Sequence, residues 1–399
     1  MKKNDYMTMR GLLLLLLLLL LNACSDTDAP DDQKKERVQL ELRPYTSSYV
    51  EEQETDATRA GDWTPPFPYV TYSSINGMFA NQKNLVNQSI NVFFTKNAED
   101  YLEGTFFYRQ SDETWQLTME VDPGDYYLYG FIPKEDATSA TITRNGDSYS
   151  DGAVLTINGL QTVTPSDVCV LIGAKEGSAF NNDATIDGEN TLRLRPGAFA
   201  TKINSTSENN YIFLLFDHLY ASLRFRFKVD ATYAALRTIR LKKLELISYS
   251  NDSGGEVYAK FDVRITLNKT DDGSSPIADI VYTPDVSSTS VPPVPIFEGE
   301  VTLRTDAETS FMGCFVPGDN TYFKLRSTYD VYDTNTNDPK GNLIRKDCQA
   351  ENTIDLRKWF GNVLTTTRGR SYALTMTVMP TYLYMLSEPD LDNPTVTIN

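Results

Sequence analysis

The stretch that decides the fold is Leu223-Arg224-Phe225-Arg226-Phe227-Lys228-Val229, in which apolar and basic residues alternate. Successive side chains of a β-strand point to opposite faces, so this stretch predicts a strand with one face in a hydrophobic core. The same alternation recurs at 261–267, 323–331 and 374–378. Short turn-forming runs rich in Gly, Pro, Asn and Asp separate such stretches. The sequence therefore predicts an all-β protein of antiparallel sheets packed face to face.

Helical periodicity is scarce in this sequence. Four apolar residues with i, i+3, i+4, i+7 spacing predict about two turns of helix, and they are Leu356, Trp359, Phe360 and Val363. Residues 233–241 predict a second short helix. Polar stretches at 181–190 and 204–210 have the composition of linkers and place a domain boundary near residue 205.

Charge and motif content exclude several classes of function. The 399 residues carry 37 Lys and Arg against 54 Asp and Glu, a formal charge of −17, which is unsuited to a polyphosphate partner and predicts no nucleic-acid binding. The chain has one histidine, His218, so a site with several histidine ligands is excluded. Phosphate-loop, dinucleotide, zinc-protease and nucleophile-elbow motifs are missing from the sequence. We predict no enzyme, no cofactor, and no catalytic, cofactor-binding or metal residue, with His218 as a hydrogen-bonded structural residue.

The N-terminal residues indicate export. Basic residues precede the apolar run 12–21, which as a helix spans only about 15 Å and is too short to cross a bilayer. Leu21, Ala23 and Cys24 resemble a bacterial lipobox, from which Asn22 departs. These features predict a signal peptide at 1–23 and lipidation at Cys24, which anchors the protein to a membrane. The acidic residues 25–32 resemble the export signal that directs Bacteroidetes lipoproteins to the cell surface.

The segment 24–59 carries two further signals. Val38, Leu40 and Leu42 alternate with polar residues and predict a short strand. The second signal is Arg59, which follows an acidic stretch and precedes the small residues 60–61. An exposed arginine in such a context suits a trypsin-like protease, so we expect cleavage between Arg59 and Ala60. The alternative is that Arg59 is an incidental basic residue and the protein keeps its lipid anchor.

Five segments together resemble the fimbrillins of Bacteroidetes, the major and minor pilus subunits. Thr58-Arg59-Ala60 looks like their maturation site, and the aromatic run 115–133 resembles a strand of the family that ends in proline. The other similar segments are 167–170, 216–225 (with Phe-x-His and Leu-Arg-Phe) and 370–375. The resemblance covers nearly the whole chain.

This resemblance implies two transthyretin-like β-sandwich domains, 60–205 and 206–399, behind a lipidated pro-segment, 24–59. It also implies assembly by strand exchange, in which the pro-segment strand leaves its own domain after cleavage and a neighbour's strand replaces it. The candidate donor is the tail that carries Val396 and Ile398. The implied function is a structural subunit of a surface pilus on the outer membrane that contributes to adhesion. The implied partners are other fimbrillin subunits, a maturation protease, and a host or bacterial surface receptor.

Two other functions stay open from the sequence. One is a pilus anchor or tip subunit that keeps its lipid. The other is a non-polymerising surface lipoprotein that binds glycans by stacking them on aromatic side chains, and the candidates are Trp63, Trp115, Trp359, Tyr126, Tyr127 and Tyr129. A disulfide between Cys314 and Cys348 also stays open.

Overall fold

The computed structural model is all-β, which confirms the predicted fold class. The residues that it describes are 40–47, 50–52, 72–74, 88–97, 101–109, 114–117, 119–177, 195–205, 211–249, 257–271, 274–306, 309–334, 341–361, 365–380 and 389–398. Helices in these ranges are short, and they are η2 (Lys134–Asp136), α3 (Ala231–Ala234) and α4 (Leu356–Trp359). The helix predicted at 233–241 is wrong beyond Ala234, because β15 begins at Arg237 and buries Ile239 and Leu241 at alternate positions.

A large sheet forms the first of two packed units. Its strands are β1 (Glu41–Ser47), β3 (Tyr72–Ser74), β4 (Ser89–Thr95), β5 (Leu102–Arg109), β6 (Thr114–Leu117), β7 (Gly124–Ile132), β11 (Cys169–Gly177), β12 (Ala200–Ile203) and β13 (Tyr211–His218). The order is β11-β13-β1-β6-β5-β4-β7-β12, with β3 on β1. Because Cys169 and Val170 of β11 also pair with β7, seven of these strands close on themselves.

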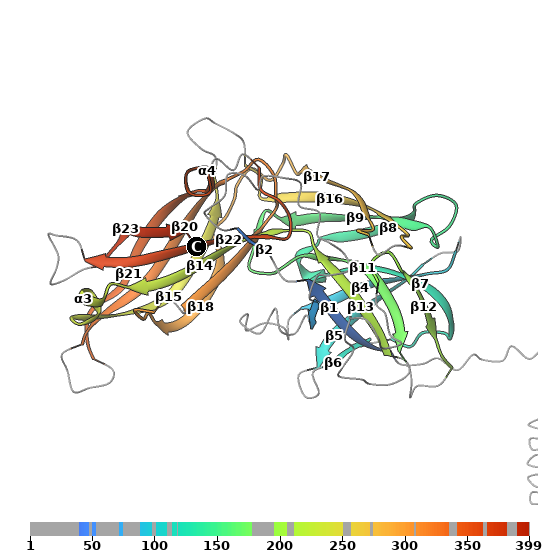
Figure 1. Ribbon diagram of the computed structural model, residues 1–399, viewed down its shortest axis with the longest axis horizontal. Coiled ribbons are helices and arrows are strands. Elements are labelled where there is room, and N and C mark those ends of the chain that lie inside the picture. The colour runs from blue at the N-terminus through green and yellow to red at the C-terminus, as the bar shows by residue number, and fades with distance from the viewer. Residues whose placement is uncertain are drawn as a thin grey trace, which may run out of the picture.

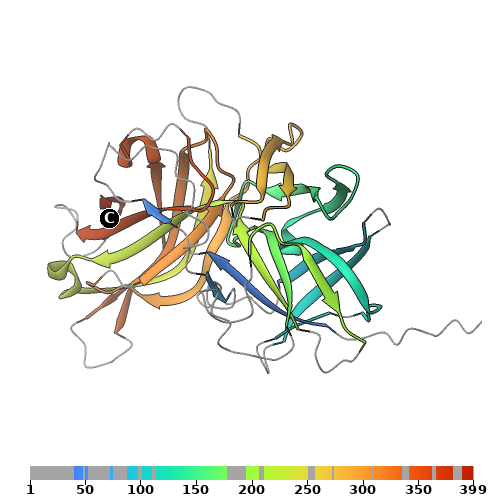
Figure 2. The same ribbon diagram turned by 45° about the vertical axis from the view of Figure 1, so that its right-hand side comes forward.

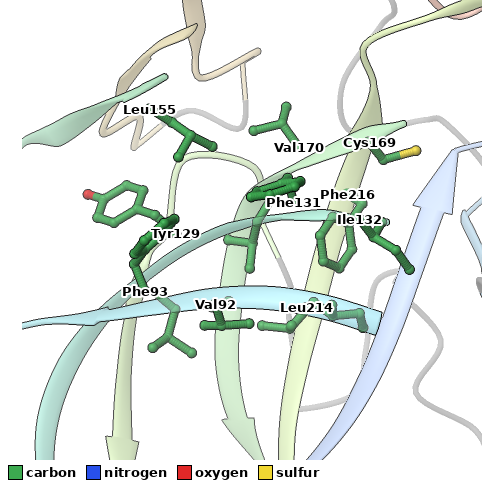
Figure 3. Packing of buried hydrophobic residues seen from close by; sticks show 14 of the residues in the cluster. Val92, Phe93, Tyr129, Phe131, Ile132, Leu155, Cys169, Val170, Leu214 and Phe216 are labelled. Atoms are coloured by element: carbon green, nitrogen blue, oxygen red, sulfur yellow. The ribbon is translucent and has the colours of Figure 1, made fainter. Parts of the chain in front are cut away.

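A four-stranded sheet covers part of this closed sheet and completes the first unit. Its order is β17-β16-β9-β8, with β8 (Ser139–Arg144), β9 (Gly152–Gln161), β16 (Lys260–Asn268) and β17 (Ile277–Pro284). Leu155 and Ile265 from this sheet join Phe93, Tyr129 and Phe216 from the closed sheet in one buried cluster. Figure 3 shows part of this cluster, with Phe93, Tyr129, Leu155, Cys169 and Phe216 labelled.

The second unit is a sandwich of two sheets. One has the order β10-β19-β14-β22-β2 and contains β10 (Val163–Thr164), β19 (Thr309–Phe315), β14 (Ala221–Val229), β22 (Arg370–Pro380) and β2 (Val50–Glu52), with β23 (Pro389–Ile398) also on β22. The other has the order β18-β15-β20-β21 and contains β18 (Val294–Thr302), β15 (Arg237–Ser248), β20 (Tyr322–Asp333) and β21 (Asn342–Asp355). The inward residues of 223–229 are buried between these sheets, as their alternation predicts.

The two units lie side by side, and the chain passes between them several times (Figures 1 and 2). β13 and β16 follow residue 205 in the chain but pair with strands that precede it, and β17 pairs with β16. Conversely, β10 precedes residue 205 and pairs with β19 of the sandwich. The boundary near 205 stays a prediction about folding units, and the sheets themselves share strands across it.

Asp136 in η2 is expected to make the protein less stable as the pH rises. Its carboxylate is partly buried and accepts a hydrogen bond from Thr164 Oγ1 at 3.0 Å. Burial raises the pKa of this carboxyl to about 6. When the pKa of a carboxyl is higher in the folded than in the unfolded protein, its ionisation lowers the free energy of unfolding. Its favourable contribution is therefore complete below about pH 4 and is lost as the pH rises to about 6.

The variant Asp136→Asn removes this ionisation and keeps an oxygen acceptor for Thr164. Near pH 4 we expect the variant and the wild type to have the same free energy of unfolding. Near pH 7.5 we expect the variant's to be higher by about 1–2 kcal/mol. One pKa unit corresponds to about 1.4 kcal/mol, and the partial exposure of the group reduces the effect. Urea unfolding at the two pH values measures this difference. The exposed Asp279→Asn is the control for the loss of one carboxylate elsewhere in the same protein. A difference for Asp136→Asn that is the same at both pH values would contradict the prediction.

Candidate functional site

β1 occupies an interior position of the closed sheet, between two strands that lie far from it in the sequence. It runs parallel to β13, with Glu41 opposite Tyr211 and Thr46 opposite Phe216. On its other side Leu42 lies opposite Trp115 of β6 in an antiparallel pair. Residues that precede Arg59 therefore form part of the sheet that encloses the first core (Figure 1).

Alternate residues of this segment point into the core. Leu40 is 2% exposed and Leu42 is fully buried, and both belong to the same buried cluster as Trp115. Pro44 and Thr46 continue the buried series at the same period of two. Pro44 falls between the residues of β1 that pair with β6 and those that pair with β3, which suits a residue without a backbone N–H.

Loss of β1 would expose two kinds of surface at once. The facing strands β13 and β6 would lose their backbone partners, and the apolar side chains that pack on Leu40 and Leu42 would lose their cover. Unpaired strand edges of this kind accept another strand, with main-chain hydrogen bonds supplying affinity and alternate side chains supplying specificity. The chemistry that this position supports is therefore the binding of an extended peptide with apolar residues at every second position.

The other residues predicted for maturation lie partly outside the described residues. Cys24, Val38, Arg59 and Ala60 all fall there, so their predicted roles stay predictions. Val396 and Ile398 lie in β23, opposite Met376 and Leu374 of β22. The neighbouring stretch of β22, residues 370–372, pairs with β2.

Those aromatic residues proposed for glycan stacking that the structure describes do not form an exposed platform. Trp115 and Tyr129 are fully buried, and Tyr126 is 5% exposed. Trp359 packs against the core of the sandwich, and Tyr127 packs against the core of the first unit. Trp63 lies outside the described residues. Alternating aromatics in these strands fill the interior, which removes the main support for the glycan-binding alternative.

His218 is buried and hydrogen-bonded at the end of β13, as predicted. Its Nδ1 lies 2.8 Å from Asp167 Oδ2 and 3.6 Å from Cys169 Sγ. A nucleophile–histidine–carboxylate relay needs the nucleophile and the carboxylate on different ring nitrogens, whereas here both approach Nδ1. All three residues are at most 1% exposed, and burial raises the pKa of the Cys169 thiol well above its usual value. The geometry is therefore unsuited to nucleophilic catalysis.

A second polar pair lies beside this group and was missed from the sequence. Asp217 Oδ1 accepts the backbone N–H of His218 at 2.9 Å, and its Oδ2 lies 2.6 Å from Arg368 Nη1. Arg368 also donates to the carbonyl oxygen of His218 at 3.0 Å. Since Arg368 belongs to the loop that leads into β22, this pair joins the two units. A lone arginine in a polar loop carries no sequence signal for such a role.

The cysteines in the described ranges form no disulfide. Cys169 and Cys314 are buried, and Cys348 is partly buried, so the Cys314–Cys348 bridge is not formed. Among the helices in the described ranges, none is long and apolar enough to span a membrane.

Comparison with known proteins finds similarity among solved structures. No protein-family model and no curated protein matches the chain. A candidate cell adhesion protein from Bacteroides fragilis matches with a TM-score of 0.38 and 12% identity, over 90% of this chain and 97% of that one. A fimbrial protein from Bacteroides vulgatus matches with a TM-score of 0.33 and 11% identity, over 90% and 98%. The fimbrial anchor protein Mfa2 from Porphyromonas gingivalis matches with a TM-score of 0.23 and 10% identity, over 89% and 95%.

Proposed function

We propose that the chain is the precursor of a pilus subunit, exported as a surface lipoprotein and assembled by exchange of β1 for a strand of another subunit. The observation that supports this proposal is the position of β1, which precedes Arg59 in the chain and fills an interior place in the closed sheet. Cleavage after Arg59 would cut the covalent link between β1 and the rest of the protein. An exchange that joins the donor surface of one subunit to the acceptor surface of the next does not close and so gives a filament.

The proposed partners follow from this mechanism. The incoming strand comes from another pilus subunit, and the tail with Val396 and Ile398 is the candidate donor. The lipid at Cys24 holds the precursor in the outer membrane until a protease with arginine specificity releases the body. The assembled filament contributes to adhesion through a host or bacterial surface receptor. The protein itself performs no chemistry in this scheme.

N-terminal sequencing of the protein from sheared surface filaments tests this function. We expect the filament form to begin at Ala60. A surface protein that begins only at lipidated Cys24 would instead be an anchor or tip subunit, because it would keep β1 in its own sheet.

A further inference from the structure

The pairing of β11 with β13 brings three different metal-binding side chains to one place. Cys169 lies directly opposite His218 across these antiparallel strands. Asp167 precedes Cys169 by two residues, and residues two apart in extended chain point to the same side. The ligand atoms of all three residues lie within 4.8 Å of one another.

The three side chains of this group interact directly with one another. The Asp167 carboxylate and the Cys169 sulfur both approach His218 Nδ1, at 2.8 and 3.6 Å. A ring nitrogen carries one hydrogen at most, so when the ring donates to Asp167 the Cys169 thiol hydrogen-bonds to the Asp167 carboxylate instead. Three ligand atoms as close together as these can also hold one metal ion in place of the hydrogens that they share.

One of the ligand separations matches a tetrahedral ion of zinc size, and a second differs from it by about 0.5 Å. Bonds of about 2.0–2.1 Å to nitrogen and 2.3 Å to sulfur place adjacent nitrogen and sulfur ligands about 3.6 Å apart. That separation matches the one between His218 and Cys169. The corresponding nitrogen–oxygen separation is about 3.3 Å, so the Asp167 oxygen would move back by about 0.5 Å.

We propose that Asp167, Cys169 and His218 bind one zinc ion, with a water molecule as the fourth ligand. The mixed set of thiolate, imidazole and carboxylate suits zinc and is unsuited to Ca²⁺ or Mg²⁺, which prefer oxygen ligands alone. Binding releases the thiol proton to solvent, and the charges of Zn²⁺, the thiolate and the carboxylate then sum to zero, which burial favours. The neighbouring Asp217 is already paired with Arg368, so its charge is balanced separately.

The ion would connect the segment before β11 to the end of β13. The chain continues from His218 through Leu219 and Tyr220 into β14 of the sandwich. Zinc would therefore fix the point at which the chain leaves the first unit, in a protein whose described cysteines form no disulfide. The sequence prediction of no metal site rested on the single histidine and on the lack of metal-binding motifs, and it did not combine Asp167, Cys169 and His218 as one ligand set.

Metal analysis of the full chain, purified after expression with added zinc, tests this proposal. We expect about one zinc per chain in the wild type. In Cys169→Ser and Asp167→Asn we expect the bound zinc per chain to fall by about tenfold or more. Cys314→Ala removes a buried thiol outside the group and should keep the zinc. Refolding with cobalt alone should give a thiolate-to-cobalt absorption band in the wild type and in Cys314→Ala, and no such band in Cys169→Ser.

A second measurement keeps the proposal testable if the variants fold poorly. The wild-type chain refolded with zinc should unfold at a higher temperature than the chain refolded with a chelator. A wild-type chain that folds without bound metal and unfolds at the same temperature in both cases would overturn the proposal and leave an Asp167–His218 ion pair. Equal zinc content in the wild type and Cys169→Ser would place the metal elsewhere and overturn it too.

Discussion

The Arg59→Ala chain should stay monomeric in the presence of an arginine-specific protease, under conditions in which the wild type forms filaments. As long as β1 is covalently attached, it competes for its own place in the sheet at an effective concentration on the order of millimolar. A strand from another subunit at micromolar concentration is then disfavoured roughly a thousandfold. Cleavage removes this advantage, because the free pro-segment is diluted into solution. Electron microscopy and sedimentation after protease treatment measure the difference.

Arg37→Ala is the matched control for this prediction. Arg37 lies on the other side of β1, so its loss leaves the cut after Arg59 intact, and assembly should proceed as in the wild type. Filaments from protease-treated Arg59→Ala would show that release of β1 by this cut is unnecessary. They would contradict the maturation scheme and leave the fold unaffected.

Leu42→Ala should destabilise the precursor and leave the Arg59-cleaved body unchanged once the pro-segment has been removed. Leu42 is fully buried in the core that contains Trp115, and replacing a buried leucine by alanine costs about 2–5 kcal/mol. The effect should disappear after cleavage because the altered strand is then gone. Urea unfolding of the precursor and of the isolated body, both kept dilute enough to remain monomeric, measures the two values.

Leu214→Ala provides the comparison for Leu42→Ala. Leu214 is equally buried and lies in β13, which remains in the body after cleavage. It should therefore destabilise both forms. Equal destabilisation of both forms by Leu42→Ala would mean that β1 stays bound after cleavage, and the proposed exchange would fail.

Individual strands could be predicted from the sequence where one face is buried and the other is exposed. The inward residues of 223–229 are all buried, and 261–267 and 323–331 fall within β16 and β20. β4 could not be found in this way, because every residue of Ser89–Thr95 is buried and no alternation marks it. Alternation of apolar and polar residues identifies a strand with one buried and one exposed face. A strand that is buried on both faces shows no such alternation.

The pairing of strands could not be predicted from the sequence, for a different reason. The pattern at 38–42 indicates a strand but not that it pairs with β13, roughly 170 residues later. The group of Asp167, Cys169 and His218 depends in the same way on register, because Cys169 lies opposite His218 only when β11 and β13 align as they do. Short-range patterns carry no information on which of many similar strands will pair, since the pairing is decided by how the whole core packs.

The outer edge of β22 places a directional constraint on any exchange at the sandwich. β2 pairs with residues 370–372 in parallel orientation, and β23 pairs with residues 374–380 in antiparallel orientation. A single continuous strand has one chain polarity, so it can reproduce one of these two pairings but not both. A subunit that loses both β2 and β23 must therefore do one of two things. It binds two separate strands, or it binds one strand whose pairing with half of this edge changes between parallel and antiparallel. Filament structures will show which of these occurs through the direction of the chain beside Arg370 and beside Met376.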